Sequence, residues 1–161
     1  MQESAPRKIN YLRMSITDRC NLRFSYCTYW QEWEKLPSRE ILSYEELLRI
    51  AALGAKVGIR KIRVTGGEPL VRRGVVDFLK NLHQIPGIEK VCLTTNGVLL
   101  PNLAPALYEA GLRHLNISLD TLRRERYREI TGKDNWREVN QAHGKQEGEA
   151  CMATLAVGNP D

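Results

Sequence analysis

Along residues 11–119 the hydrophobic positions follow two spacings, the two-residue period of a strand and the 3.6-residue period of a helix. Short apolar or β-branched runs predict four strands, at residues 11–17, 60–65, 90–95 and 114–119. Apolar residues at helical spacing fill the intervals between them, at residues 44–57, 75–85 and 103–110. Strands that alternate with helices in this way are typical of βα units and a parallel sheet.

The predicted helix at 44–57 carries signals for both of its ends. Ser43 and Glu46 stand at the spacing of a capping box, in which each side chain accepts a backbone hydrogen bond from the other residue. Gly58 is suited to the left-handed position that follows the last turn, and Gly111 is suited to the same position after the helix at 103–110.

Alternation within the strands gives each one a polar and an apolar face. In the first strand Arg13, Ser15 and Thr17 oppose Leu12, Met14 and Ile16, and in the second Lys61 and Arg63 oppose Ile62 and Val64. A parallel strand covered by helices on both sides would be almost wholly apolar. We therefore favour a barrel-like sheet over an open doubly wound one, with a polar inner face that includes Cys92, Thr94, Asn96 and Ser118.

Four strands cannot close a barrel, so the expected fold is α/β, an incomplete arc of a TIM-type (βα) barrel. With 161 residues the chain is expected to form one domain. Residues 1–10 are expected to be a lead-in, residues 11–139 the partial barrel, and residues 140–161 a divergent tail. Neither period continues after Asn140, so we expect the tail to be poorly ordered.

Composition and charge exclude several classes of protein. Prolines and asparagines interrupt the longest uncharged stretch, residues 91–108, so no membrane span is expected. The first residues lack the apolar core of an export signal, which favours a cytoplasmic location. The net charge of +5 favours anionic partners such as nucleic acid or phosphate ligands, or serves solubility. No nucleic-acid-binding motif is present, so we expect no nucleic-acid partner.

The four cysteines are too few and too unevenly spaced for a disulfide scaffold, which leaves metal binding or packing as their use. Cys20 and Cys27 follow the first strand, where barrel proteins place functional loops. Cys92 lies within the third predicted strand, and Cys151 lies in the tail.

Four segments in order, residues 17–27, 61–70, 93–97 and 116–120, together resemble the radical S-adenosylmethionine superfamily. Within it, the chain is most similar to the GTP 3',8-cyclase family of molybdenum cofactor biosynthesis, from Ile9 to Val139. The resemblance implies a [4Fe–4S] cluster, S-adenosylmethionine as cofactor and GTP as substrate. The implied lyase reaction converts GTP to a 3',8-cyclo-dihydroguanosine triphosphate through a 5'-deoxyadenosyl radical.

The resemblance also implies a metal site, and the chain departs from it there. Cys20 and Cys27 match the outer two of the three cluster cysteines, but Phe24 occupies the middle position and cannot coordinate iron. The family also continues through further βα units and a region with a second cluster. We therefore expect a weak, oxygen-labile or absent cluster, and family membership with catalysis impaired or absent. The alternative is a non-catalytic, truncated remnant or paralogue that at most binds S-adenosylmethionine or GTP.

Further residues are implied as ligand contacts. The implied cofactor contacts are Tyr26, Gly66, Gly67, Glu68, Thr94 and Ser118. Of these, Thr94 and Ser118 already fall on the inner face by alternation alone. The glycine pair could equally form a strand-to-helix turn, and Tyr26 could equally serve packing.

Basic residues complete the expected site. Alternation directs Arg13, Lys61 and Arg63 to the inner face, with Asp120 as an inward acid, and cations there would suit an anion such as a triphosphate. The resemblance implies that all three bind the GTP phosphates. The remaining basic pairs, at positions 72–73 and 123–124, together with Arg126 and Arg128, are expected on solvated helix faces. The open edge of the arc could pair with a second copy of the chain.

Overall fold

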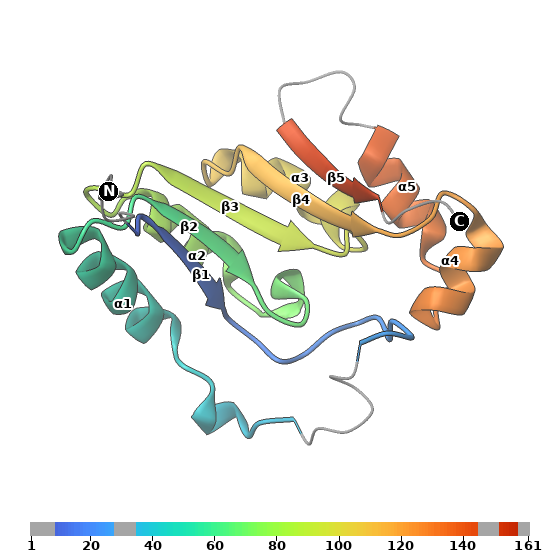
Figure 1. Cartoon of the computed structure of the whole chain (residues 1–161), viewed down its shortest axis with the longest axis horizontal. Coiled ribbons are helices and arrows are strands. Elements are labelled where there is room, and N and C mark those ends of the chain that lie inside the picture. The colour runs from blue at the N-terminus through green and yellow to red at the C-terminus, as the bar shows by residue number, and fades with distance from the viewer. Residues whose placement is uncertain (1–8, 28–34, 145–151, 158–161) are drawn as a thin grey trace, which may run out of the picture.

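The strands form one parallel sheet whose order follows the chain, as the computed structural model in Figure 1 shows. Residues 9–27, 35–144 and 152–157 are described. The strands are β1 (Tyr11–Ser15), β2 (Lys61–Thr65), β3 (Lys90–Thr95), β4 (His114–Leu119) and β5 (Met152–Val157). The helices are α1 (Tyr44–Lys56), α2 (Val75–His83), α3 (Leu100–Glu109), α4 (Arg124–Thr131) and α5 (Trp136–Gly144), with short 3-10 turns η2 (Ser38–Glu40) and η3 (Pro69–Val71).

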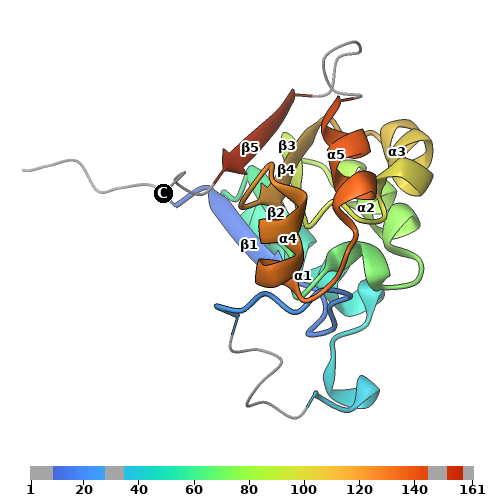
Figure 2. The ribbon, with the colours of Figure 1, turned by 90° about the vertical axis from the view of Figure 1, so that its right-hand side faces the viewer.

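The helices cover one face of the sheet. Figure 2 shows α2, α3 and α5 on the same side of the strands, and in the described part of the chain no helix covers the opposite side. Ile62, Leu93 and Ile117 are fully buried on the covered face, whereas Arg13 is exposed on the open face. The predicted α/β arc with one apolar and one polar face is confirmed.

Packing of α2 onto the sheet forms the centre of the core. Phe78, Leu79 and Leu82 on one side of α2 are almost completely buried, and the ring of Phe78 stacks on Tyr44 of α1 with the centroids 4.6 Å apart. Truncating a buried phenylalanine costs about 3–5 kcal/mol. This layer therefore contributes strongly to the stability of the core beneath the sheet.

The predicted boundaries of α1 are confirmed. Ser43 Oγ accepts from the Glu46 amide at 3.2 Å, and Glu46 Oε2 accepts from the Ser43 amide at 2.7 Å. Gly58 and Gly111 have positive φ values, of 105° and 91°. Helix α3 begins at Leu100, three residues before the predicted start, because Pro101 is tolerated in a first turn, where an amide needs no partner.

The carboxyl end contains two elements that the sequence analysis did not predict. Helix α5 runs to Gly144, and β5 pairs with β4 over six residues, from His114↔Met152 to Leu119↔Val157. The tail is therefore not irregular throughout, and the arc has five strands instead of four. The small residues of β5 show no alternation of polarity, which is why periodicity missed it. The expected lead-in at 1–8, Cys151 and the rest of the tail lie outside the described residues.

Candidate functional site

A cavity of about 630 Å³ lies at the carboxyl ends of β1 to β4. Parallel strands present their carboxyl ends at one edge of the sheet, which is where barrel folds build their sites. Its lining comprises Arg13, Asp18, Cys20, Asn21, Leu22, Arg23, Phe24, Cys27, Lys35, Thr65, Gly66, Gly67, Glu68, Thr94, Thr95, Asn96, Ser118 and Lys133. The structure thus brings together most of the residues that the sequence indicated, from segments far apart in the chain.

The glycine pair after β2 packs directly on the loop after β1. The Gly67 amide donates to the Thr17 carbonyl at 2.7 Å, and the Glu68 amide donates to the Arg19 carbonyl at 2.8 Å. A Cβ at Gly66 would lie 2.5 Å from the Thr17 oxygen. Because only glycine allows this approach, the pair sets the distance between the turn and the cysteine-containing loop.

The side chain of Glu68 is 1% exposed and turns into the protein. Its Oε1 accepts from the Leu70 amide at 2.9 Å and from Thr95 Oγ1 at 2.7 Å, while Oε2 accepts from the Asn96 amide at 2.6 Å. Burial raises the pKa of the Glu68 carboxyl, and these hydrogen bonds oppose the rise. Glu68 therefore joins the turn after β2 to the end of β3, and its contact with the cofactor stays a prediction.

The loop at 20–27 is anchored on both sides. On one side Asn96, at the end of β3, donates through Nδ2 to Asn21 Oδ1 at 2.8 Å and lies 3.9 Å from Cys20 Sγ. On the other side the amides of Arg23 and Ser25 donate to the last carbonyls of α4, at 2.9 and 2.7 Å. These bonds satisfy carbonyls that a helix end leaves without partners. Protein contacts therefore hold the loop on two sides.

The residues present do not fit a cluster held by three cysteines. Cys20 and Cys27 line the cavity with Phe24 between them, and the described residues contain no group of three histidine, cysteine or acidic side chains that could hold a metal. Burial raises the pKa of the Cys20 thiol. The ring of Phe24 packs against the core and lies 5.3 Å from the ring of Tyr26.

Tyr26 lies outside the lining of the cavity. Its ring is 63% exposed, and its hydroxyl donates to Asp120 Oδ2 at 2.7 Å. Burial, with the hydrogen bond to Asp120, raises the pKa of Tyr26. Asp120, expected as an inward acid, is thus bound to the loop at 20–27.

The three cations expected for phosphate share the open face but not the cavity. Arg13 lines it, and its neighbour in register is Arg63. Arg63 donates through Nε to Tyr11 Oη at 2.8 Å and through Nη1 to Thr94 Oγ1 at 3.1 Å. Lys61 Nζ lies 5.3 Å from the centroid of the Tyr11 ring. Neither Lys61 nor Arg63 is among the lining residues.

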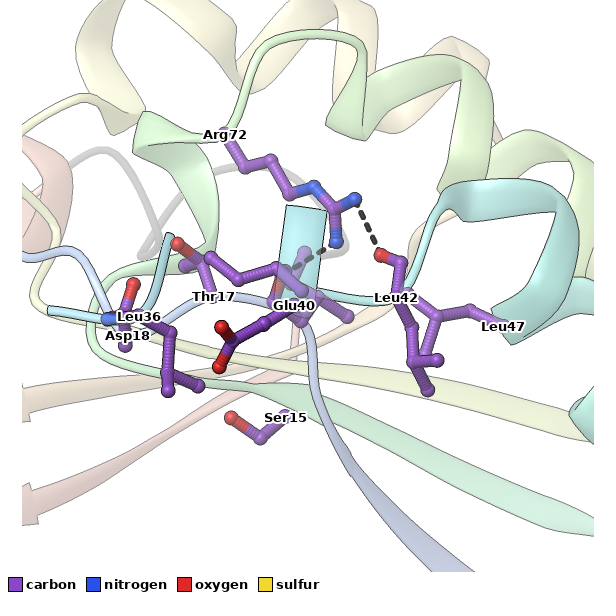
Figure 3. Close-up of a pocket in the computed structure, with 10 residues that line it drawn as sticks. Ser15, Thr17, Asp18, Leu36, Glu40, Leu42, Leu47 and Arg72 are labelled. Atoms are coloured by element: carbon purple, nitrogen blue, oxygen red, sulfur yellow. Dashed lines mark hydrogen bonds between the residues drawn. The ribbon is translucent and has the colours of Figure 1, made fainter. Parts of the chain in front are cut away.

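The expectation that Arg72 lies on a solvated helix face is wrong. Its guanidinium donates to the carbonyls of Ile16 and Leu42, and Figure 3 shows the bond to Leu42. The guanidinium carbon also lies 4.1 Å from the centroid of the Tyr44 ring. Arg72 lines a smaller cavity of about 180 Å³, and it ties the end of β1 to the segment that leads into α1. Arg124, also expected on a solvated face, forms a bidentate pair with Asp134.

Sequence reasoning missed three further cations of the large cavity, Arg23, Lys35 and Lys133. The position of Arg23 within the cysteine-containing loop was the one signal that could have pointed to it. Lys35 and Lys133 lie in irregular segments, where neither the helix period nor the strand period indicates the direction of a side chain.

Comparison with known proteins identifies the family. The sequence profile described as "Radical SAM superfamily" matches residues 14–145. This chain belongs to the radical SAM superfamily. Among solved structures, this radical SAM chain is similar to SuiB of Streptococcus suis bound to S-adenosylmethionine (TM-score 0.73, 17% identity, 91% of this chain and 33% of that one). It is also similar to HydG, a maturase of the [FeFe]-hydrogenase (TM-score 0.71, 18% identity, 90% and 34%).

Curated relatives carry a more specific name. The "GTP 3',8-cyclase" of Geobacter sulfurreducens is 56% identical over 129 residues, which are 80% of this radical SAM chain and 40% of the relative. The protein of the same name from Petrotoga mobilis is 50% identical over 155 residues, 96% of this chain and 46% of the relative. The chain thus spans less than half the length of these relatives. Because the second alignment covers 155 residues, the likeness extends beyond Val139, where the sequence analysis had ended it.

No helix in the described residues is long and apolar enough to cross a membrane.

Proposed function

We propose that this chain carries the ligand-binding barrel of a GTP 3',8-cyclase-type protein of molybdenum cofactor biosynthesis, with radical chemistry impaired. The observation that carries the proposal is the cavity itself, which gathers Gly66, Gly67, Thr94, Ser118 and Arg13 next to the cysteine-containing loop. The relatives named GTP 3',8-cyclase support the GTP 3',8-cyclase-type part of this proposal.

Two kinds of residue line the cavity, and each kind suits one of the two proposed ligands, S-adenosylmethionine and GTP. The hydroxyls of Thr94 and Ser118 and the backbone of the glycine pair suit the polar groups of S-adenosylmethionine. The guanidinium of Arg13 suits a phosphate of GTP, which it can bind through two parallel hydrogen bonds. We assign Lys61 and Arg63, which lie on the neighbouring strand, to the same phosphates as Arg13.

Phe24 carries the proposal of impaired chemistry. The loop at 20–27 offers two thiols where three hold the cluster in the family, and the described residues contain no group of three metal-ligating side chains. This arrangement also favours the second candidate function, a protein that binds S-adenosylmethionine or GTP without catalysis. A cytoplasmic location and self-association through an open sheet edge remain predictions.

Anaerobic reconstitution with iron and sulfide tests the cluster. We expect the wild-type chain to give substoichiometric iron and no reducible four-iron signal by EPR, and Phe24→Cys to gain such a signal. Phe24→Leu is the matched control, since it removes the ring and adds no thiol. A stoichiometric, reducible four-iron cluster in the wild-type chain would overturn the proposed impairment.

Calorimetric titration tests ligand binding separately from chemistry. GTP and S-adenosylmethionine are each expected to bind, and Arg13→Gln is expected to weaken GTP about tenfold, because it removes a charge-assisted hydrogen bond. If neither ligand binds a folded chain, the proposed function is wrong. Cyclised product from GTP, S-adenosylmethionine and a reductant would exclude the binding-only alternative.

A further inference from the structure

Arg63, on β2, bonds to both neighbouring strands through one guanidinium. Its Nε donates to Tyr11 Oη of β1 at 2.8 Å, and its Nη1 donates to Thr94 Oγ1 of β3 at 3.1 Å. Arg63 and Thr94 are both half-buried, and the bond between them is partly shielded from water. Thr94 lines the large cavity, whereas Arg63 does not. Arg63 therefore reaches the lining of the cavity through Thr94.

The bond from Arg63 limits what the Thr94 hydroxyl can do for a ligand. A guanidinium has N–H donors and no acceptor, so Thr94 Oγ1 is the acceptor in this pair. A hydroxyl carries a single proton, and the described residues provide no acceptor for the proton of Thr94. This proton is therefore available to an acceptor atom in the cavity that Thr94 lines.

Ser118, another hydroxyl of the lining, provides a contrast. Its side chain has no hydrogen-bond partner among the described residues, so Ser118 can donate to a ligand or accept from it. At Thr94 one lone pair is already occupied by Arg63. The protein therefore sets the role of Thr94 before a ligand arrives, and such preorganisation lowers the cost of binding.

We propose that Arg63 is a positioning residue for S-adenosylmethionine, because it holds the Thr94 hydroxyl as a donor toward an acceptor oxygen of this ligand. The carboxylate and the ribose of S-adenosylmethionine both provide such oxygens. The bond to Tyr11 holds the guanidinium from the other neighbouring strand. The remaining N–H groups of Arg63 can still bind a phosphate, which is compatible with its assignment to GTP. The proposal rests on the proposed function, in which this cavity takes S-adenosylmethionine.

The charge of S-adenosylmethionine separates positioning from simple attraction. The ligand carries a sulfonium, an ammonium and a carboxylate, so its net charge at neutral pH is positive. By charge alone, removal of a cation from the open face would leave its affinity unchanged or raise it. A loss of affinity after removal of Arg63 is instead what the loss of a hydrogen-bond arrangement predicts.

Calorimetric titration of S-adenosylmethionine into the whole chain tests the proposal. Arg63→Met keeps a side chain of similar length without N–H groups, and it is expected to weaken binding about threefold to tenfold. Lys90→Met is the matched control, because Lys90 is a half-buried cation at the start of β3, the strand of Thr94. The control is expected to change the affinity less than about twofold.

A double-mutant cycle shows whether Arg63 acts through Thr94. In a Thr94→Val background, Arg63→Met is expected to change the affinity by less than about a further twofold, because the hydroxyl is already absent. In a Thr94→Ser background, which keeps a hydroxyl, the loss caused by Arg63→Met is expected to return. Circular dichroism checks folding, and Arg63→Leu replaces Arg63→Met if that variant does not fold.

Other outcomes would overturn the positioning role. An equal loss in Lys90→Met, or an undiminished loss in the Thr94→Val background, would show that Arg63 does not act through the hydroxyl. If Arg63→Met weakened only GTP, the positioning role would be wrong and the proposed function would stand. A folded wild-type chain that binds neither ligand would remove both.

Discussion

The hydroxyl of Tyr26 donates a 2.7 Å hydrogen bond to Asp120 Oδ2, and this bond joins segments 94 residues apart in the chain. It closes the side of the cysteine-containing loop that faces the end of β4. The amides of Arg23 and Ser25 also donate to carbonyls of α4. Hydrogen bonds therefore join the loop to the end of β4 and to α4.

The bond between Tyr26 and Asp120 is expected to control the mobility of the loop more than global stability. The bond lies at an exposed site, so Tyr26→Phe is expected to lower the free energy of unfolding by about 1 kcal/mol or less. Amide hydrogen exchange of residues 20–27, read by mass spectrometry, is expected to become faster. Tyr108→Phe is the control, since this exposed tyrosine lies on α3, away from the loop. Unchanged exchange in Tyr26→Phe would contradict the role of this bond.

Cys20 is expected to react with iodoacetamide only at higher pH than an ordinary thiol. Burial raises its pKa, so at a given pH the folded chain holds less thiolate than the unfolded chain does. The stabilising contribution of the neutral thiol is present below the ordinary pKa and is lost as the pH rises through the folded value. Peptide mass spectrometry can follow the pH midpoint of alkylation with and without urea. A folded midpoint at or below the unfolded one would contradict this prediction.

Arg72 is expected to stabilise the chain through its two backbone partners. Arg72→Ala removes two hydrogen bonds from a charged donor to the carbonyls of Ile16 and Leu42, so the free energy of unfolding is expected to fall by about 2–3 kcal/mol. Arg72→Lys keeps the charge but not the forked geometry, so its free energy of unfolding is expected to lie between those of the wild-type chain and Arg72→Ala. Arg73→Ala is expected to stay within about 0.5 kcal/mol. Equal urea midpoints for Arg72→Ala and Arg73→Ala would refute the role of Arg72.

Gly67 is expected to tolerate no side chain. An added Cβ would lie 2.7 Å from the carbonyl carbon of Arg19, so Gly67→Ala must push the turn after β2 away from the loop after β1. We expect a loss of about 3 kcal/mol or more in stability. Gly54→Ala in α1 is the matched control, where the nearest contact would be an ordinary 3.4 Å, and it is expected to change stability by about 1 kcal/mol or less. Similar urea midpoints for the two variants would show that the approach at Gly67 is not tight.

The sequence could predict the position of a side chain where the strand or helix period determines which way that side chain points. Thr94, Ser118 and Arg13 lie on strands, where every second side chain faces the same side, and all three line the cavity as expected. The capping box of α1 is equally local, since both of its partners lie within one turn. The arc could be predicted for the same reason, because parallel strands with helices on both sides would lack a polar face.

The sequence could not reveal contacts between distant segments. Arg72 is an ordinary surface arginine by its neighbours in the chain, and only the fold brings it to its two carbonyl partners, Ile16 and Leu42. The protein donors of Glu68 come from the end of β3 and from its own turn, so its burial could not be read from the Gly-Gly-Glu-Pro motif. Lys133 reaches the cavity because Thr131 holds its turn, a three-dimensional relationship without a sequence signature.

The sheet order, which follows the chain from β1 to β5, has a consequence for how the protein is made. Each of the strands β2 to β5 pairs with the strand that precedes it, so each new βα unit finds a partner already synthesised. Among the described strands, none has to be inserted between two earlier ones. Because chains emerge from the ribosome amino end first, the sheet can grow by addition during translation.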